Sequence, residues 1–245
     1  MGVVSWDGGR VSIRASVQVP RAITGAKLRD SYIEAIKTQT LGLARFRDGS
    51  IMLGPLTLLR FGPPKVTRNA VDWPIEGGLL ARRAGGNWRL QAATGRVEAT
   101  VAGYTPRLPR PIYAATHMQV HQLFSRLYLL HLRGRDSLPG TPATPGDRFR
   151  AGTVDVAFCL TLAGFSGRRR LRRTLFVIAV YHIVCWSISG RTLGGLVMRQ
   201  RVAAIDGTRL TPTQALLRLA LTPVSWLSRR PVHDEIAATE VIADP

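Results

Sequence analysis

The sequence is poor in acidic residues and in lysine. Against 34 basic residues it has 15 acidic ones, which gives a formal net charge of +19, and only Lys27, Lys37 and Lys65 are lysines. Arginine bias of this kind is typical of a GC-rich genome, but a positive surplus also attracts phosphate in anionic lipids or nucleic acid. Aromatic residues do not alternate with a basic stripe, so lipid is the favoured partner. A soluble basic nucleic-acid-binding protein is the weaker alternative.

Cysteine is scarce, and catalytic or metal-binding patterns are missing. The two cysteines, Cys159 and Cys185, lie in apolar runs, where reduced thiols behave as small hydrophobic side chains, so no disulfide framework is expected. His117 and His121 share a helix face, but the zinc pattern of metalloproteases needs a glutamate where Met118 stands. No paired acids, nucleophile–histidine order or phosphate-binding loop is present. The sequence therefore predicts a non-enzymatic protein without cofactor or metal ion.

Targeting segments and long hydrophobic runs are missing as well. The N-terminus has no basic segment followed by an apolar stretch, as a secretory signal peptide would have, so we expect the first domain to lie in the cytoplasm. A membrane-spanning helix needs about 20 apolar residues. The two best runs, 151–165 and 174–189, each fall slightly short of that length.

A segment rich in proline and glycine, residues 133–147, divides the chain. It holds three prolines and three glycines in fifteen residues, which suits neither a helix nor a central strand. We therefore expect a first domain at 1–132, a linker at 133–147 and a second domain at 148–245.

The first domain is predicted to be α+β. Apolar and polar residues alternate over 11–19, as in a half-buried strand, and Thr24 then caps a helix over 25–39. Pro111 opens a long helix that runs to about residue 132. Between these helices, short strands of an antiparallel sheet are expected at 50–60, 69–73, 78–83, 88–93 and 96–104, with turns at Gly85-Gly86 and Thr94-Gly95.

This order of elements is similar to that of helix-grip domains of the START and polyketide-cyclase-like superfamily. The resemblance implies a curved sheet that wraps the last helix around an apolar cavity. Binding of an apolar small molecule or lipid by the first domain is thus an alternative function. An unrelated α+β domain or β-barrel with a filled core would show the same element order.

The second domain is predicted to be helical and to enter a membrane. Arginines stand before the first apolar run, in the RRRLRR segment 168–173 between the runs, and after the second run, so the positive-inside rule cannot be satisfied at all three places. Either the arginine segment crosses the membrane or the first run is re-entrant or interfacial. An amphipathic stretch over 213–227 could lie in the headgroup plane. A soluble helical bundle is the alternative for all three segments.

In the second domain Arg148, Ala151 and Asp155 stand at spacings of three and four, a Gly-Arg-Thr-Leu-Gly turn over 190–194 ends the second apolar run, and His233-Asp234 lies near the end. In this order the positions resemble the RDD family of bacterial membrane proteins, which is named for one arginine and two aspartates. The resemblance covers residues 148–245 and implies a location in the bacterial cytoplasmic membrane, with a role in transport or in support of a membrane complex, and a homo-oligomer as an open alternative. Further along, Asp206-Gly207, residues 214–218 and Thr239-x-Val241 also correspond to the family pattern. The family-motif residues are Arg148, Ala151, Asp155, Gly190, Arg191, Thr192, Gly194, His233 and Asp234.

Asp155 is the motif residue with the most definite physical requirement, because a carboxylate in an apolar helix is costly without a partner. We expect it to meet Arg191 or Arg218 from another segment and to fix the helix arrangement, with an ion or proton pathway as the alternative. Gly190 and Gly194 are interpreted as backbone devices at a helix end, which permit positive φ or close packing.

Overall fold

The computed structural model describes residues 3–136, 138–164, 170–228 and 230–244. It divides into two compact units, Met1–Arg133 and Gly134–Pro245. Much of the segment expected to be a linker is therefore built into the second unit. Strand β10 (Thr141–Pro142) pairs with a strand of that unit, and helix α4 (Pro145–Ala163) already begins at a proline. Proline fits the first turn of a helix, where its missing N–H leaves no helical bond unmade.

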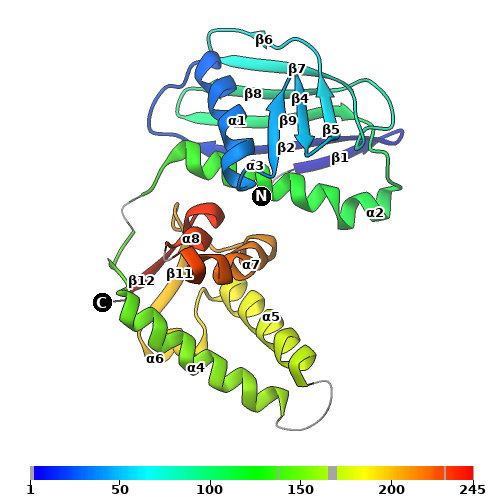
Figure 1. Ribbon diagram of the computed structural model, residues 1–245. Coiled ribbons are helices and arrows are strands. Elements are labelled where there is room, and N and C mark those ends of the chain that lie inside the picture. Colours follow the sequence, from blue (N-terminus) through cyan, green and yellow to red (C-terminus); the bar gives the residue numbers. More distant parts are fainter. Residues whose placement is uncertain (1–2, 137, 165–169, 229, 245) are drawn as a thin grey trace. The chain divides into compact units, whose positions relative to one another are not determined.

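The first unit is built on a nine-stranded sheet in which every described pair is antiparallel (Figure 1). The strand order is β1-β2-β9-β8-β7-β5-β4-β3, and β6 pairs with β7 outside this path. The strands are β1 (Val3–Asp7), β2 (Arg10–Gln18), β3 (Ala44–Arg47), β4 (Ser50–Leu53), β5 (Leu56–Phe61), β6 (Lys65–Val66), β7 (Ala70–Gly77), β8 (Asn87–Ala93) and β9 (Arg96–Tyr104).

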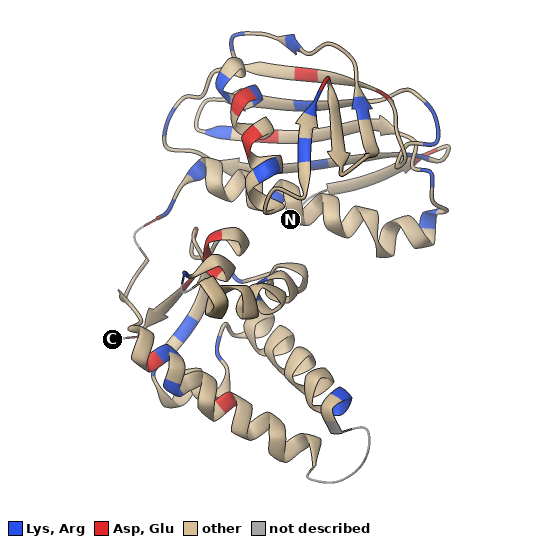
Figure 2. Cartoon of the chain, viewed as in Figure 1, with Lys and Arg blue, Asp and Glu red and all other residues tan. Residues whose placement is uncertain are grey.

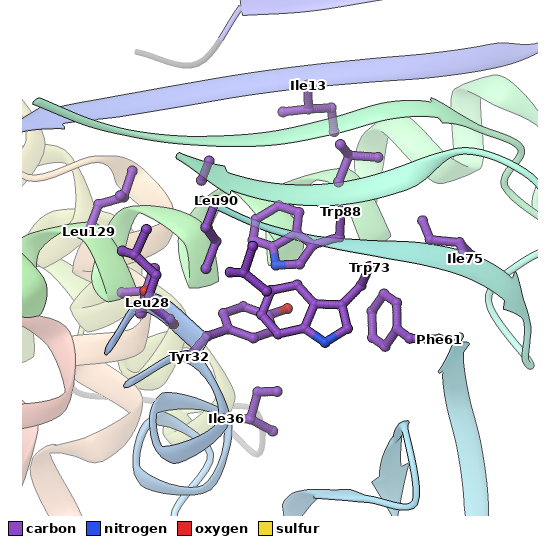
Figure 3. Close-up of a cluster of buried hydrophobic side chains, with 14 of the residues drawn as sticks. Ile13, Leu28, Tyr32, Ile36, Phe61, Trp73, Ile75, Trp88, Leu90 and Leu129 are labelled. Atoms are coloured by element: carbon purple, nitrogen blue, oxygen red, sulfur yellow. Dashed lines mark hydrogen bonds between the residues drawn. The ribbon is translucent and has the colours of Figure 1, made fainter. Parts of the chain in front are cut away.

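Helices α1 (Gly25–Gln39) and α3 (His117–Arg133) pack on the sheet and on each other. Thr24 caps α1 as expected, since its hydroxyl accepts a bond from the N–H of Lys27 at 3.3 Å. The core lies between α1 and the sheet, where Tyr32 stacks against Trp73 and Trp88 (Figure 3). The expected order of strand, helix, antiparallel meander and C-terminal helix is thus present, while the relation to helix-grip domains stays a prediction.

Four local predictions for the first unit differ from the structure. Strand β1 was not foreseen, and the run 50–60 folds as a hairpin of β4 and β5 because Gly54 turns the chain with a φ of 56°. Residues 78–83 form no strand and contribute one isolated bridge at Ala81. The long helix breaks at Thr116 into α2 (Arg110–Ala115) and α3.

The second unit combines helices with a small antiparallel sheet of order β10-β12-β11 (Figure 1). The two apolar runs form α4 and α5, which pack against each other, and the amphipathic stretch forms α7. Arginine segment 168–173 lies partly outside the described residues, and α5 begins at its third position. The remaining elements are α5 (Arg170–Ile188), α6 (Leu193–Val197), β11 (Gln200–Ala204), α7 (Pro212–Ser228), α8 (Val232–Ala237) and β12 (Thr239–Ala243).

Charged residues are sparse along the two long helices of this unit. Helix α5 carries none from Thr174 to its end, and Asp155 is the lone charge in α4 beyond its first turns (Figure 2). In the part of the chain that the structure describes, the stretch Leu171–Ile188 is the one helix long and apolar enough to cross a membrane.

Candidate functional site

Asp234 is the centre of a buried cluster of ionised groups in the second unit. It lies in the first turn of α8, where the helix dipole favours a carboxylate. Its Oδ2 accepts a bond from Nη1 of Arg148 at 2.8 Å, and its Oδ1 accepts from Nη1 of Arg218 and from the hydroxyl of Thr239. We call these four residues the Asp234 cluster. It joins α4, α7, α8 and β12, so it ties the whole unit together.

Burial decides the protonation of the cluster and of its neighbour His233. Arg218 is only 4% exposed. Burial, followed by repulsion from Arg148, lowers the pKa of Arg218 to about 9, which still leaves it charged at neutral pH. Burial and the same two arginines lower the pKa of His233 to about 3, so this ring is neutral. Its Nε2 lies 3.5 Å from Asp234 but forms no ion pair, while its Nδ1 is hydrogen bonded to Ser225.

Asp155 forms a second buried polar group, and its partners differ from those expected. Its Oδ1 accepts a bond from the hydroxyl of Tyr181 and one from the backbone N–H of Gly194, both at 2.8 Å. Its Oδ2 lies 3.9 Å from Nε2 of His182. The prediction of an arginine partner is wrong, because a tyrosine hydroxyl and a helix N-terminal N–H supply the donors that a buried carboxylate needs.

The two arginines proposed as partners of Asp155 bind other carboxylates. Arg218 belongs to the Asp234 cluster, and Arg191 forms an ion pair with Asp244. Asp244 also receives Nε of Arg201 at 3.3 Å. Arg191 and Arg201, which follow α5, thus both bind Asp244, the residue directly after β12.

The two motif glycines around the end of α5 act through the backbone, as predicted. Gly194 lies against α4 so closely that a Cβ there would overlap the carbonyl oxygen of Ala151. Gly190 has a φ of 74°, and a Cβ on it would come within 2.5 Å of the carbonyl oxygen of Val202. Thr192 caps α6, since its hydroxyl accepts a bond from the N–H of Gly195 at 3.0 Å.

A cavity of about 690 Å³ opens among α4, α5, α7, β11 and β12. Both polar groups line it: Asp155 and His182, and Arg148, Arg218 and His233. Apolar side chains including Val156, Ile178, Trp186, Leu219 and Trp226 make up much of the remaining wall. The structure therefore brings the family-motif residues of the first run, at α4, to those of the last, at α8, around one cavity.

Among the residues that the structure describes, no metal-binding group accompanies this cavity. Over residues 3–136, 138–164, 170–228 and 230–244, no group of three histidine, cysteine or carboxylate side chains is placed to hold a metal ion. Cys159 and Cys185 are free thiols. In the first unit His117 and His121 lie on a cavity wall, and burial lowers the pKa of His121 to about 4, so that ring is neutral.

Sequence reasoning missed the contacts by which Tyr181, His182 and Thr239 complete the two polar groups. Tyr181 and His182 interrupt an apolar run side by side, which is the signal that could have paired them with the acid of the preceding run. Thr239 was noted as a motif match without a role. Its partners lie in α7 and α8, and no spacing in the sequence predicts that contact.

Comparison with known families finds a match within the second unit. Residues 173–237 match the model of the RDD family. Gly190, Arg191, Thr192, Gly194, His233 and Asp234 lie inside the matched range, whereas the three motif residues of α4 precede it. No curated protein and no solved structure matches the chain.

Proposed function

Since the C-terminal part of the chain carries an RDD family domain, we propose that this is an integral membrane protein whose helices α4 and α5 enter the bilayer. One observation carries the proposal. Only 17% of the stretch Leu171–Ile188 is buried, although its mean hydropathy is 1.4. A core helix of a soluble bundle would hide most of such a surface, so the soluble alternative is disfavoured.

Exposed apolar side chains on neighbouring helices support the same interpretation. Each of α4 and α5 has 19 residues and extends roughly 28 Å, close to the thickness of a bilayer core. Asp155 of α4 is turned inward and hydrogen bonded, so it is not exposed to the hydrocarbon of the bilayer. The exposed residues are Phe149, Val156 and Leu162 of α4, Leu171, Leu175, Phe176, Val180, Val184 and Ile188 of α5, and Leu216, Val224, Trp226 and Leu227 of α7.

The role we propose is non-catalytic, either transport across a bacterial cytoplasmic membrane or support of a membrane complex, with the first unit in the cytoplasm. The buried charges of the second unit are typical of polar sites within membrane domains. The lack of a metal-binding group among the described residues neither favours nor disfavours a non-catalytic role. The net charge of +19 favours a membrane surface rich in anionic lipid. A homo-oligomer is compatible with the exposed apolar faces.

Alkaline extraction of membranes from expressing cells tests the location. We expect the full-length protein to stay in the membrane pellet, and the variant Val180→Arg to insert poorly, because a charge in the middle of a spanning helix costs about 3 kcal/mol. Val180 is exposed on α5, and the matched control is Leu43→Arg at an exposed position of the first unit. Release of the wild-type chain into the soluble fraction, or equal behaviour of the two variants, would contradict the proposal.

The first unit supports a second candidate function, binding of an apolar ligand. A cavity of about 380 Å³ lies beside the core, and its lining is almost entirely apolar and aromatic, including Ile36, Ala44, Phe61, Tyr104 and Phe124. Arginine and lysine are missing from the described lining, and the buried His121 is neutral, so the site offers no charge to an anionic head. A neutral apolar molecule is the ligand that these walls fit.

Filling this cavity with a larger side chain tests the candidate. In Ala44→Phe the added ring would occupy the site, and we expect the affinity for the neutral dye N-phenyl-1-naphthylamine to fall roughly tenfold. The measurement is energy transfer from tryptophan to the dye, with full-length protein in nanodiscs and empty nanodiscs as background. Ala84→Phe, at an exposed loop position outside the cavity, is the control. Equal affinity of the two variants would remove the candidate.

A further inference from the structure

The cavity of the second unit has a cationic wall made by Arg148 and Arg218. Each arginine gives one nitrogen, Nη1, to Asp234. Among the described residues, neither Nη2 has a hydrogen bond partner, and the buried Nε of both residues also has none. Two guanidinium groups thus share one carboxylate and keep N–H donors unused. Such donors suit a phosphate, which accepts bonds from several guanidinium nitrogens at once.

A second, anionic wall of the same cavity is made by Asp155 and His182. Oδ1 of Asp155 is occupied by Tyr181 and Gly194, whereas Oδ2 accepts no bond from the described residues. Nδ1 of His182 donates to the carbonyl of Ile178 at 2.9 Å, so in the neutral ring Nε2 carries a lone pair. Oδ2 and Nε2 are 3.9 Å apart, and both are acceptors. A group that donates two N–H bonds would satisfy them together.

Other charges on the cavity wall are already compensated. Arg201 lies 3.3 Å from Asp244, and Arg230 lies 4.0 Å from Glu235. Glu240 of β12 also acts on Arg148 electrostatically. Arg148 and Arg218 therefore keep unused donors in this cavity, and Asp155 and His182 keep unused acceptors. Two other buried atoms of lining residues, Oε1 of Gln200 and Nε of Arg201, also have no hydrogen-bond partner among the described residues. A ligand with a single charge would pair with the charged groups of one wall and leave those of the other wall without a partner.

We propose that this cavity binds the headgroup of a zwitterionic phospholipid with a primary ammonium, that is, a phosphoethanolamine lipid. The phosphate lies at Arg148 and Arg218, and the ammonium donates to Oδ2 of Asp155 and Nε2 of His182. A phosphocholine headgroup has the same charges but no N–H to donate. A purely anionic headgroup lacks the cation that the Asp155 wall requires. The proposal names a ligand for the membrane domain and rests on its location in the bilayer.

The apolar part of the cavity offers a path for the acyl chains. Trp186 contacts a residue of each wall, since its ring lies 4.9 Å from that of His182 and 5.1 Å from the guanidinium carbon of Arg218. Trp226, Ile178 and Leu219 also line the cavity. Helix α5 ends at Ile188, so His182 lies roughly 9 Å inside that end, a depth suited to a headgroup and the first methylenes.

A series of headgroups tests the proposal on the wild-type protein. Full-length protein in mixed micelles is titrated with phosphatidylethanolamine, its mono- and dimethyl derivatives, phosphatidylcholine and phosphatidylglycerol of equal chain length, and bound lipid is counted by native mass spectrometry. We expect the monomethyl derivative, which keeps two N–H groups, to bind about as well as the ethanolamine lipid, and the dimethyl derivative to bind more weakly. The choline lipid should bind about tenfold more weakly than the ethanolamine lipid, and the glycerol lipid should also be weak. Equal affinity for the ethanolamine and choline lipids would overturn the proposal.

Variants assign the two ends of the headgroup. Asp155→Asn keeps an oxygen for Tyr181 and Gly194 but removes the charge, so the preference for ethanolamine should fall to roughly equal binding. Asp206→Asn, a turn residue outside the cavity, should keep the preference. Arg148→Gln should weaken all phospholipids by about tenfold and leave their order unchanged. A preference that survives Asp155→Asn would contradict the assignment.

Two further measurements distinguish the identity of the ligand from the membrane location of the protein. Soluble glycerophosphoethanolamine should compete poorly, because it lacks the acyl chains; competition as strong as that of the lipid would identify a soluble zwitterion as the occupant and overturn the lipid. A protein that resists alkaline extraction but shows no headgroup preference would refute this inference alone. A protein that is released from membranes would refute the membrane location as well.

Discussion

Asp234→Ala is expected to lower the free energy of unfolding of the second unit by about 3–5 kcal/mol. The substitution leaves Arg218 charged and buried without its carboxylate, and it also removes the acceptor of Arg148 and Thr239. The loss is large because whole domains are stable by only about 5–15 kcal/mol. Denaturant titration of the full-length protein in mixed micelles, followed by the fluorescence of Trp186 and Trp226, measures it.

Asp244→Ala is the matched control for this prediction. Asp244 also receives two arginines, Arg191 and Arg201, but its side chain is 21% exposed, against 6% for Asp234. Water can solvate the arginines that it would leave behind, so the expected loss is about 0–1 kcal/mol. Similar losses in the two variants would show that burial does not set the strength of the Asp234 cluster.

The sequence predicts local features of this chain better than its long-range contacts. Thr24 and its helix, the turn at Thr94-Gly95 and the extents of α5 and α7 follow from capping residues, glycine and periodicity, which act within a few positions. The break at Thr116 and the strand at Val3–Asp7 were missed. The strand is a local feature, because β1 pairs with β2 across a turn at Gly8-Gly9, and this glycine pair is a signal that the sequence carries.

In the candidate site, too, local features were predicted better than long-range contacts. A buried carboxylate at 155 predicts that some donor must reach it, and that part of the expectation is met. Its donors lie 26 and 39 positions further along the chain, and choosing among Tyr181, Gly194 and the arginines requires the helix arrangement itself. Helical spacing puts Arg148 and Asp155 on one face of α4, but each contacts a different element, α8 for the arginine and α6 for the acid.

Gly194→Ala is expected to be comparably damaging, with a loss of about 3–5 kcal/mol. Its Cβ would overlap the carbonyl oxygen of Ala151, which is backbone of α4 and cannot rotate away. Overpacking of this kind costs about 1–3 kcal/mol. Separation of α6 from α4 would also stretch the bond from the Gly194 N–H to Asp155, a bond to a charged group worth about 1.5–3 kcal/mol.

Gly152→Ala gives this prediction a control of opposite sign. Gly152 neighbours Ala151 on α4, and no atom lies within 4 Å of a Cβ built there. Alanine in a helix interior is favoured over glycine by about 1 kcal/mol, so this variant should be as stable as the wild type or more stable. The same denaturant titration distinguishes the two positions, since both replace glycine with alanine beside the same helix backbone. If Gly194→Ala were as stable as Gly152→Ala, close contact between α4 and α6 could not be what holds Asp155 in place.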